Sequence, residues 1–129
     1  GQLDEALRIR QQEELPVYER LGDVRSKAVT MGQIADILQS RGQLDEALST
    51  QENVLKICEQ LNDTQGLLVT KTKIAMLLME FKPPYRSRRL EANQLLCEAL
   101  HAAQQMRIPE AEQIADILRG YGMGCLEQD

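Results

Sequence analysis

Aromatic residues are scarce in this sequence and tryptophan is absent: Phe, Tyr and Trp together make up 3% of the 129 residues. Apolar and polar residues alternate nowhere for more than a few positions, so both usual signs of β-strands are missing. No apolar run approaches the roughly 20 residues that a helix needs to cross a bilayer. We therefore expect an all-α protein with no membrane-spanning helix and no membrane partner.

Histidine and cysteine are also scarce. The only histidine, His101, has no metal-ligating residue at a suitable spacing, so we expect an exposed helical side chain rather than a metal ligand or general base. Cys58, Cys97 and Cys125 form an odd, widely spaced set, which is typical of reduced thiols in the cytosol, and we expect no disulfide bridge. No catalytic constellation is present, so we predict a cytoplasmic protein without enzymatic activity, metal or cofactor.

Positive charge is in deficit: 15 Lys and Arg stand against 20 Asp and Glu, a formal net charge of -5. This balance argues against nucleic acid as a partner, because phosphate binding relies on clustered Lys and Arg. The N-terminus opens with acidic residues instead of the basic and then apolar segment of a secretory signal. One basic cluster stands out, formed by Lys82, Arg86, Arg88 and Arg89. It is either a solvated loop, or a secondary contact for an acidic partner, or a segment with a modifiable serine, Ser87.

What the chain does have is internal repetition. The residues GQLDEAL occur at 1–7 and again at 42–48, and QIADIL occurs at 33–38 and again at 113–118. KIAMLL, at 73–78, lies midway between the two copies of QIADIL. The repeating unit is therefore about 40 residues long, a period at which small helical modules stack on one another. Such architectures bind other molecules and rarely catalyse reactions.

Apolar residues recur at spacings of three and four through most of the chain, which predicts six helices. The expected ranges are 2–21, 24–40, 44–61, 65–81, 90–106 and 108–121. Gly120, Gly122 and Gly124 follow a helix and have no strand before them, which excludes a phosphate-binding loop. They leave a short tail that we expect to fray.

Two irregularities interrupt the period. The segment 7–21 is one residue longer than the matching segment 48–61, and Pro16 lies in the same stretch. We predict that a π-type bulge near Gln12 absorbs both and bends the first helix. Further along, Ala92 follows Ala47 by 45 positions rather than 40, so five residues are inserted. Because two adjacent prolines cannot continue a helix, we expect these residues in a loop over 82–89.

The predicted organisation is one repeat domain over 1–129. It comprises the second helix of a partial repeat at 1–22, full repeats at 23–62 and 63–107, the first helix of a partial repeat at 108–121, and a tail at 122–129.

These paired helices resemble the tetratricopeptide repeat, whose first helix reads W-x2-L-G-x2-Y and whose second carries A-x3-F. The matching residues are Met31, Ile34, Ala35 and Leu38 with Ala47, Gln51 and Val54, then Lys71, Ile74, Ala75 and Leu78 with Ala92, Leu96 and Ala99, and finally Ala115. The departures are the missing Trp and closing proline, Lys71 at a large apolar position, and Arg10 and Gln51 at aromatic ones. The period exceeds the usual value of about 34, so the chain is similar to the longer variant of kinesin light chains and bacterial signalling proteins.

The resemblance implies a right-handed α-solenoid of antiparallel helix pairs that binds an extended or helical peptide in a concave groove. The first helix of each pair lines that groove. The residues expected to project into it are Gln33, Asp36, Gln39, Lys73, Met76, Glu80, Gln113, Asp116 and Arg119. Their mixture of charges and amides suggests a polar, extended ligand. Family members that clamp a C-terminal carboxylate use Lys and Asn where this chain has Gly32 and Asp36, so we expect no such clamp.

Three functions remain to be weighed. The first is a protein-interaction scaffold that forms part of a larger signalling or regulatory protein, and the second is a self-associating structural module. The third, an enzyme or nucleic-acid binder, is opposed by the net charge and the lack of a catalytic constellation.

The terminal helices bear on the second of these functions. They carry apolar stripes where repeat arrays normally end in polar capping helices. The stripes are Leu3, Leu7 and Val17 at one end and Ile114, Ile117, Leu118 and Tyr121 at the other. We expect either a segment of a longer array or a homo-oligomer, formed as a dimer or an end-to-end stack through these helices.

Overall fold

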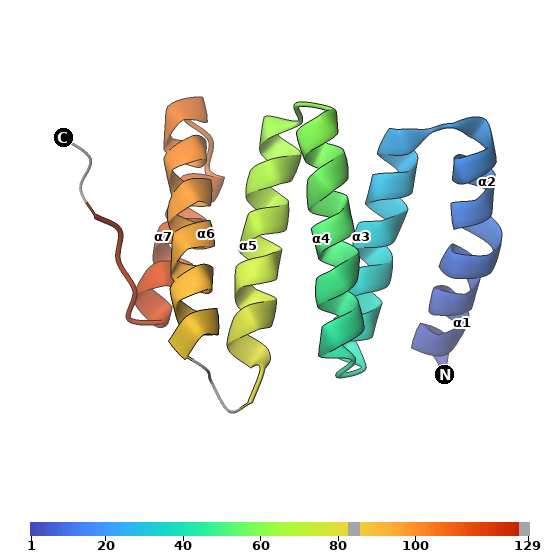
Figure 1. Cartoon of the computed structure of the whole chain (residues 1–129), viewed down its shortest axis with the longest axis horizontal. Coiled ribbons are helices and arrows are strands. Elements are labelled where there is room, and N and C mark those ends of the chain that lie inside the picture. The colour runs from blue at the N-terminus through green and yellow to red at the C-terminus, as the bar shows by residue number, and fades with distance from the viewer. Residues whose placement is uncertain (83–85, 127–129) are drawn as a thin grey trace. The chain divides into compact units, whose positions relative to one another are not determined.

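The computed structural model describes residues 1–82 and 86–126, and all regular secondary structure in these ranges is helical (Figure 1). The predicted all-α fold class is confirmed, and the described ranges contain six helices when the interrupted first helix is counted as one. None of the helices described is both long enough and apolar enough to span a membrane. The chain divides into two compact units, Gly1–Asn62 and Asp63–Asp129. The division falls at the predicted boundary between the two full repeats.

Unit 1, Gly1–Asn62, combines a long interrupted helix with a pair of closely packed helices. The interrupted helix consists of α1 (Gln2–Ile9), a π-helical turn η1 (Arg10–Glu14) and α2 (Leu15–Leu21). All three parts contact α3 (Val24–Ser40), which packs along α4 (Leu44–Gln60). The core of the unit is formed by Leu7, Ala28, Ile34, Ala35, Leu38, Ala47, Val54 and Cys58, with the polar residues Thr30 and Gln51 also buried.

The first helix contains the predicted π-type bulge. The backbone N–H of Leu15 donates a hydrogen bond to the carbonyl of Arg10, five residues earlier, as in a π-helix. Pro16 then lies in the first turn of α2, where its missing N–H donor does least harm. The prediction of a π-type bulge near Gln12 is confirmed. The wide turn takes up the extra residue, so α1 and α2 both keep a face against α3.

In unit 2, Asp63–Asp129, the described residues form three helices. The central helix α6 (Arg86–Met106) packs against both α5 (Thr64–Glu80) and α7 (Glu110–Gly120). An ion pair links α5 to α6, with 3.1 Å between Lys71 Nζ and Glu98 Oε2. This contact explains how a lysine occupies a position where the resemblance led us to expect a large apolar residue. The core of the unit is formed by Leu68, Ile74, Ala75, Leu77, Leu78, Ala92, Leu96, Ala99, Ala103, Ile114 and Leu118.

The turns that precede α3 and α5 repeat the same chemistry. Asp23 and Asp63 cap these helices, and each carboxylate accepts a hydrogen bond from the backbone N–H three residues later, at 3.1 and 2.9 Å. Gly22 and Asn62, one position earlier, have φ angles of 65° and 53°, in the left-handed region that Gly and Asn enter most readily. The second and fourth predicted helices therefore begin within one residue of their expected starts.

The predicted loop over 82–89 is wrong in its second half. Helix α6 begins at Arg86, so Arg86, Arg88 and Arg89 lie in its first turns. Helix α4 begins at residue 44, and the offset between the two repeats is 45 residues here, so the equivalent position in unit 2 is Arg89. Helix α6 therefore begins three residues before the position at which its counterpart α4 begins. Arginine is a good helix former, so these residues lengthen the helix instead of forming a loop. Residues 83–85, which include the two prolines, lie outside the described residues.

The terminal helices bury more of their apolar residues than expected. Leu3 and Val17 are 48% and 39% exposed, as predicted for an uncovered stripe. In contrast, Leu7, Ile114 and Leu118 are only 8%, 2% and 4% exposed, so their predicted exposure is wrong. The reason is that α1 packs against α3 and α7 packs against α6. An apolar surface is therefore left mainly on the first helix of unit 1.

The π-type turn predicts how the first helix tolerates a deletion. Removing Gln12 and replacing Pro16 with Ala eliminates both causes of the bulge, so a regular α-helix should form with its two ends in their present register. We expect the free energy of unfolding to change by less than about 1 kcal/mol. Deletion of the exposed Glu52 from α4 is the control, because it rotates Val54 and Cys58 out of the core and should cost about 3 kcal/mol or more. Urea denaturation measures both variants, and equal losses would contradict this interpretation.

The cap of α3 makes the stability of unit 1 depend on pH. Hydrogen bonds with Ser26 lower the pKa of Asp23 from its usual value of 3.8. Because the pKa of Asp23 is lower in the folded than in the unfolded protein, its ionised carboxylate stabilises the folded state at every pH above the unfolded pKa. This stabilisation is lost as the pH falls through the folded pKa. We therefore expect Asp23→Ala to destabilise the protein at about pH 7, and to destabilise it much less once the pH falls below the folded pKa of Asp23. Urea denaturation across this range tests it, and the control Asp23→Asn keeps an acceptor without a charge. An Asp23→Ala effect of equal size at both pH values would show that ionisation is irrelevant.

Candidate functional site

The nine residues predicted to line a groove lie on three helices, and we refer to them as the first-helix residues. They are Gln33, Asp36 and Gln39 on α3 in unit 1, and Lys73, Met76 and Glu80 on α5 with Gln113, Asp116 and Arg119 on α7 in unit 2. Gln39 and Lys73 are half-buried and the others are exposed. On each helix they flank a buried isoleucine of the same register, namely Ile34, Ile74 and Ile114. Gln33, Lys73 and Gln113 are thus equivalent, as are Asp36, Met76 and Asp116, whereas Glu80 lies one position beyond the equivalent of Gln39 and Arg119.

Within unit 2, Glu80 at the end of α5 lies near Tyr121, the residue that follows α7. The pKa of Tyr121, the residue after α7, is raised chiefly by burial of its side chain and also by the negative charge of Glu80 at the end of α5. On α7, Arg119 donates a hydrogen bond to Asp116 one turn earlier, and both side chains are exposed. An exposed pair of this kind adds little stability, so either charge can be redirected to a ligand without a large cost.

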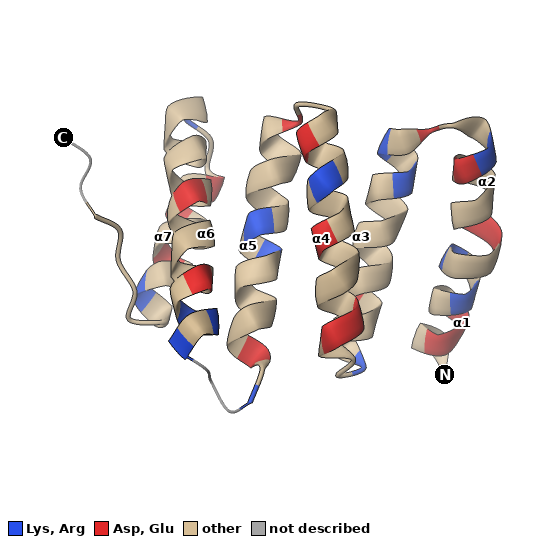
Figure 2. Ribbon diagram, in the orientation of Figure 1, with Lys and Arg blue, Asp and Glu red and all other residues tan. Residues whose placement is uncertain are grey.

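The arginines of the basic cluster contact different neighbours. The guanidinium of Arg88 lies over the ring of Phe81, with Cζ 4.1 Å from the ring centroid, in a cation–π contact. Arg89 Nη2 donates to the backbone carbonyl of Tyr121, beyond the end of α7. Figure 2 shows the positive charges gathered at the first turns of α6. Arg88 and Arg89 therefore join α6 to the ends of both neighbouring helices, so these two residues of the cluster do not belong to a solvated loop.

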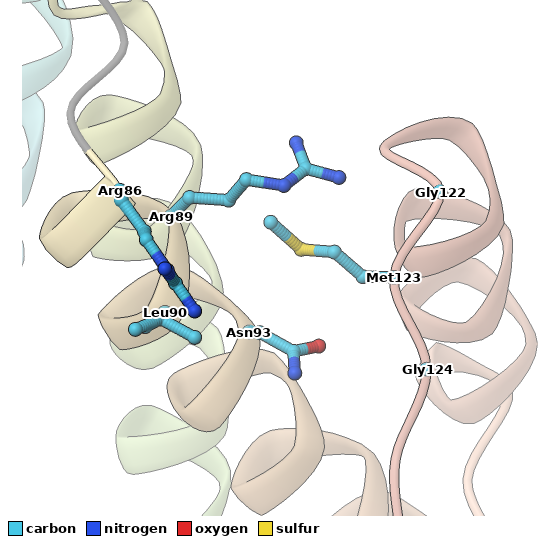
Figure 3. Close-up of a pocket in the computed structure, with 7 residues that line it drawn as sticks. All are labelled: Arg86, Arg89, Leu90, Asn93, Gly122, Met123 and Gly124. Carbon is cyan, nitrogen blue, oxygen red and sulfur yellow. The ribbon is translucent and has the colours of Figure 1, made fainter.

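A pocket of about 290 Å³ lies between the first turns of α6 and the segment that follows α7 (Figure 3). Helix α6 contributes Arg86, Arg89, Leu90 and Asn93, and the segment contributes Gly122, Met123 and Gly124. In Figure 3, the side chain of Arg89 extends toward this segment, and that of Met123 extends back toward α6. The lining thus combines positive charge, one amide and apolar side chains.

A disulfide between Cys97 and Cys125 holds this segment to α6, and the prediction that no bridge forms is wrong. Their Cα atoms are 5.6 Å apart, within the usual range for a bridge. The spacing of the cysteines along the chain does not reveal this approach, because Cys125 returns to α6 only through the reversal of the chain after α7. Cys58, in unit 1, is a buried thiol.

The expected fraying of the tail is also wrong for its first part. The N–H groups of Gly122 and Met123 donate to the carbonyls of Arg119 and Leu118, at 3.0 and 2.8 Å, in the pattern that commonly ends a helix. Gly122 has a φ angle of 68°, which this reversal requires. The chain therefore turns back toward α6 before it reaches Cys125. Residues 127–129 of the predicted tail lie outside the described residues.

The sequence interpretation included Arg86 and Arg89 but missed the other pocket residues. Asn93 was not singled out, and residues 122–124 were assigned to the tail. The available signal was Gly122 directly after a helix, because glycine favours the left-handed conformation with which a chain commonly reverses at a helix end.

Neither a metal centre nor a known relative helps to assign the site. In residues 1–82 and 86–126, no three or more His, Cys, Asp or Glu side chains gather in a way that would hold a metal ion, and His101 is an exposed helical residue. No family model, curated protein or solved structure matches this chain. The functional argument therefore depends on the geometry of the two candidate surfaces.

The disulfide predicts the thiol content of the oxidised protein. Alkylation without reductant should modify one cysteine, Cys58, and only after denaturation, because this thiol is buried. Peptide mapping by mass spectrometry should find Cys97 linked to Cys125. Reduction should lower the free energy of unfolding by about 3 kcal/mol, since a bridge closing a loop of this length restricts the unfolded chain. If protein purified under oxidising conditions takes up label at all three cysteines, the bridge is not formed.

Proposed function

We propose that this chain is a non-enzymatic protein-interaction module of the tetratricopeptide class, which binds a peptide or partner protein through its first-helix residues. One observation carries the proposal. Helices α3, α5 and α7 bury the same register of residues, while the flanking surface positions of α5, Lys73 and Met76, differ from the Gln and Asp that α3 and α7 share, and Arg119 of α7 stands where α3 has Gln39. Repeat modules need a constant register in order to pack, and varied outer positions allow them to select a ligand.

The first-helix residues of unit 2 suggest the chemistry of that ligand. Lys73 and Arg119 supply positive charge, Glu80 supplies negative charge, and Met76 leaves 37% of its surface exposed. A complementary peptide would be extended and polar, with an acidic side chain for the two cations and an apolar one for Met76. Methionine suits such a contact because its flexible, polarisable side chain adapts to different partners.

Self-association is a second candidate, favoured by the apolar surface of the first helix in unit 1. Leu3 and Val17 are exposed there, and Leu21 is 72% exposed. A second copy of the chain could cover these side chains through a symmetric contact of the same face. This candidate uses unit 1 and leaves the first-helix residues of unit 2 available.

The proposal includes a place in a larger signalling or regulatory protein and a cytoplasmic location. In the cytoplasm the Cys97–Cys125 bridge would exchange with dithiol reductants, so both the oxidised and the reduced chain would have to be considered.

The first-helix residues predict a ranking of charge-reversal variants. Peptides selected from a random displayed library would supply a ligand, and isothermal titration would measure its affinity. We expect Lys73→Glu with Arg119→Glu to weaken binding by about tenfold or more, because each removes a charge-assisted contact. The matched control, Arg88→Glu with Arg89→Glu, changes the net charge equally and should change the affinity by less than about threefold.

The opposite ranking would reject the first-helix residues as the binding surface. Sedimentation of the pure protein and of a Leu3→Ser, Leu21→Ser variant separates the second candidate from the first. A monomer in both preparations would remove self-association from consideration.

A further inference from the structure

We propose that the pocket between α6 and residues 122–124 is a binding site for a small carboxylate that carries a short apolar chain, and that it is complete only while the Cys97–Cys125 bridge is intact. The site lies apart from the first-helix residues, and it does not depend on the function proposed above.

The pocket carries the positive charge of two arginines, Arg86 and Arg89. Arg86 and Arg89 are three positions apart on α6 and so share one face of the helix. Among the described residues, neither guanidinium forms an ion pair with a carboxylate within 4.0 Å. Arg89 uses Nη2 for the carbonyl of Tyr121, which leaves other N–H donors of its planar fork available. Two guanidinium groups with unused donors favour a planar oxyanion, which can accept paired hydrogen bonds.

The other residues that line the pocket favour a carboxylate with an apolar chain over an inorganic anion. Leu90, 59% exposed, and Met123 present apolar surface beside the two arginines, and Asn93 adds an amide that can donate or accept. An inorganic anion would leave this apolar surface uncovered, whereas a carboxylate with a chain of a few carbons would cover it. A volume of about 290 Å³ is at the small end for ligand pockets, which fits a ligand of this size.

The bridge keeps one wall of the pocket in place. Gly122, Met123 and Gly124 line the pocket, and Cys125 follows them directly. Cys125 is exposed and Cys97 half-buried, so a dithiol can attack the bridge. The dithiol donates two electrons and two protons, becomes a cyclic disulfide, and leaves two cysteine thiols. Among the described residues, the segment would then be held by the hydrogen bonds at the end of α7, the Arg89–Tyr121 contact, the packing of Met123 and the contact of Cys97 Sγ with the Gly124 carbonyl, without a covalent link.

Titration of the oxidised protein with four probes tests the ligand class. The probes are hexanoate, acetate, 1-hexanol and inorganic phosphate, and the readouts are the NMR signals of the Met123 methyl group and of the Arg86 and Arg89 side chains. We expect saturable shifts with hexanoate, at least about tenfold weaker binding of acetate because its chain buries less apolar surface, and no binding of 1-hexanol. If phosphate or acetate binds as tightly as hexanoate, or if hexanoate causes no shift, the proposed ligand class is wrong.

Variants test the residues and the bridge. Arg86→Gln and Arg89→Gln should each weaken hexanoate binding by about tenfold. Arg88→Gln is the matched control, since it removes the same charge from the same region of α6 but contacts Phe81, and it should change binding by less than about twofold. An equal effect of Arg88→Gln and Arg89→Gln would mean that net charge, not the pocket, attracts the probe.

Reduction with dithiothreitol, and separately Cys125→Ser, should abolish the saturable shifts while circular dichroism shows that the helices persist. Reduced protein that binds hexanoate with unchanged affinity would overturn the requirement for the bridge. None of these outcomes bears on peptide binding by the first-helix residues, so the two proposals fail independently.

Discussion

The close approach of helices at alanine side chains is the constraint on which the rest of the structure depends. Ala35, Ala47, Ala75, Ala92 and Ala99 are each at most 1% exposed, and they lie where paired helices meet. Two helices can approach to the shortest interaxial distances only where the side chains between them are small. Once these positions are buried, the helical period determines which residues face outward. The first-helix residues are surface residues for this reason.

Local features of the fold could be predicted from the sequence, and non-local ones could not. The π-type turn followed from Pro16 and one extra residue in the same stretch, and the starts of α3 and α5 followed from capping aspartates beside Gly22 and Asn62. Each of these depends on neighbours within a few positions. The Cys97–Cys125 bridge depends instead on the path of the chain through all of α7, which no spacing in the sequence reveals. The early start of α6 was missed because the preceding prolines suggested a longer loop.

The two candidate surfaces also differ in whether local or non-local features of the sequence determine them. The register of the repeat predicted which positions of α3, α5 and α7 would lie beside the core, because equivalent residues have equivalent neighbours. The pocket on α6 could be predicted only through its arginines, because its other wall comes from a segment more than a helix away. Unit 2 thus carries two candidate surfaces. The first-helix residues occupy positions set by the repeat, whereas the pocket is formed with residues 122–124, which follow the last helix of the repeat. The two surfaces also differ in charge: the first-helix residues carry charges of both signs, whereas positive charge is concentrated at the pocket (Figure 2).

The bridge also has a mechanical consequence. It joins two residues that are 28 positions apart and encloses the last part of α6 together with all of α7. When tension is applied along the chain, the load passes through the sulfur atoms, and the enclosed residues carry none of it. Breaking the bridge would release roughly 90 Å of additional contour length, at about 3.3 to 3.6 Å per extended residue. One covalent bond thus determines whether residues 97–125 respond to force as a short, stiff link or as a long, extensible one.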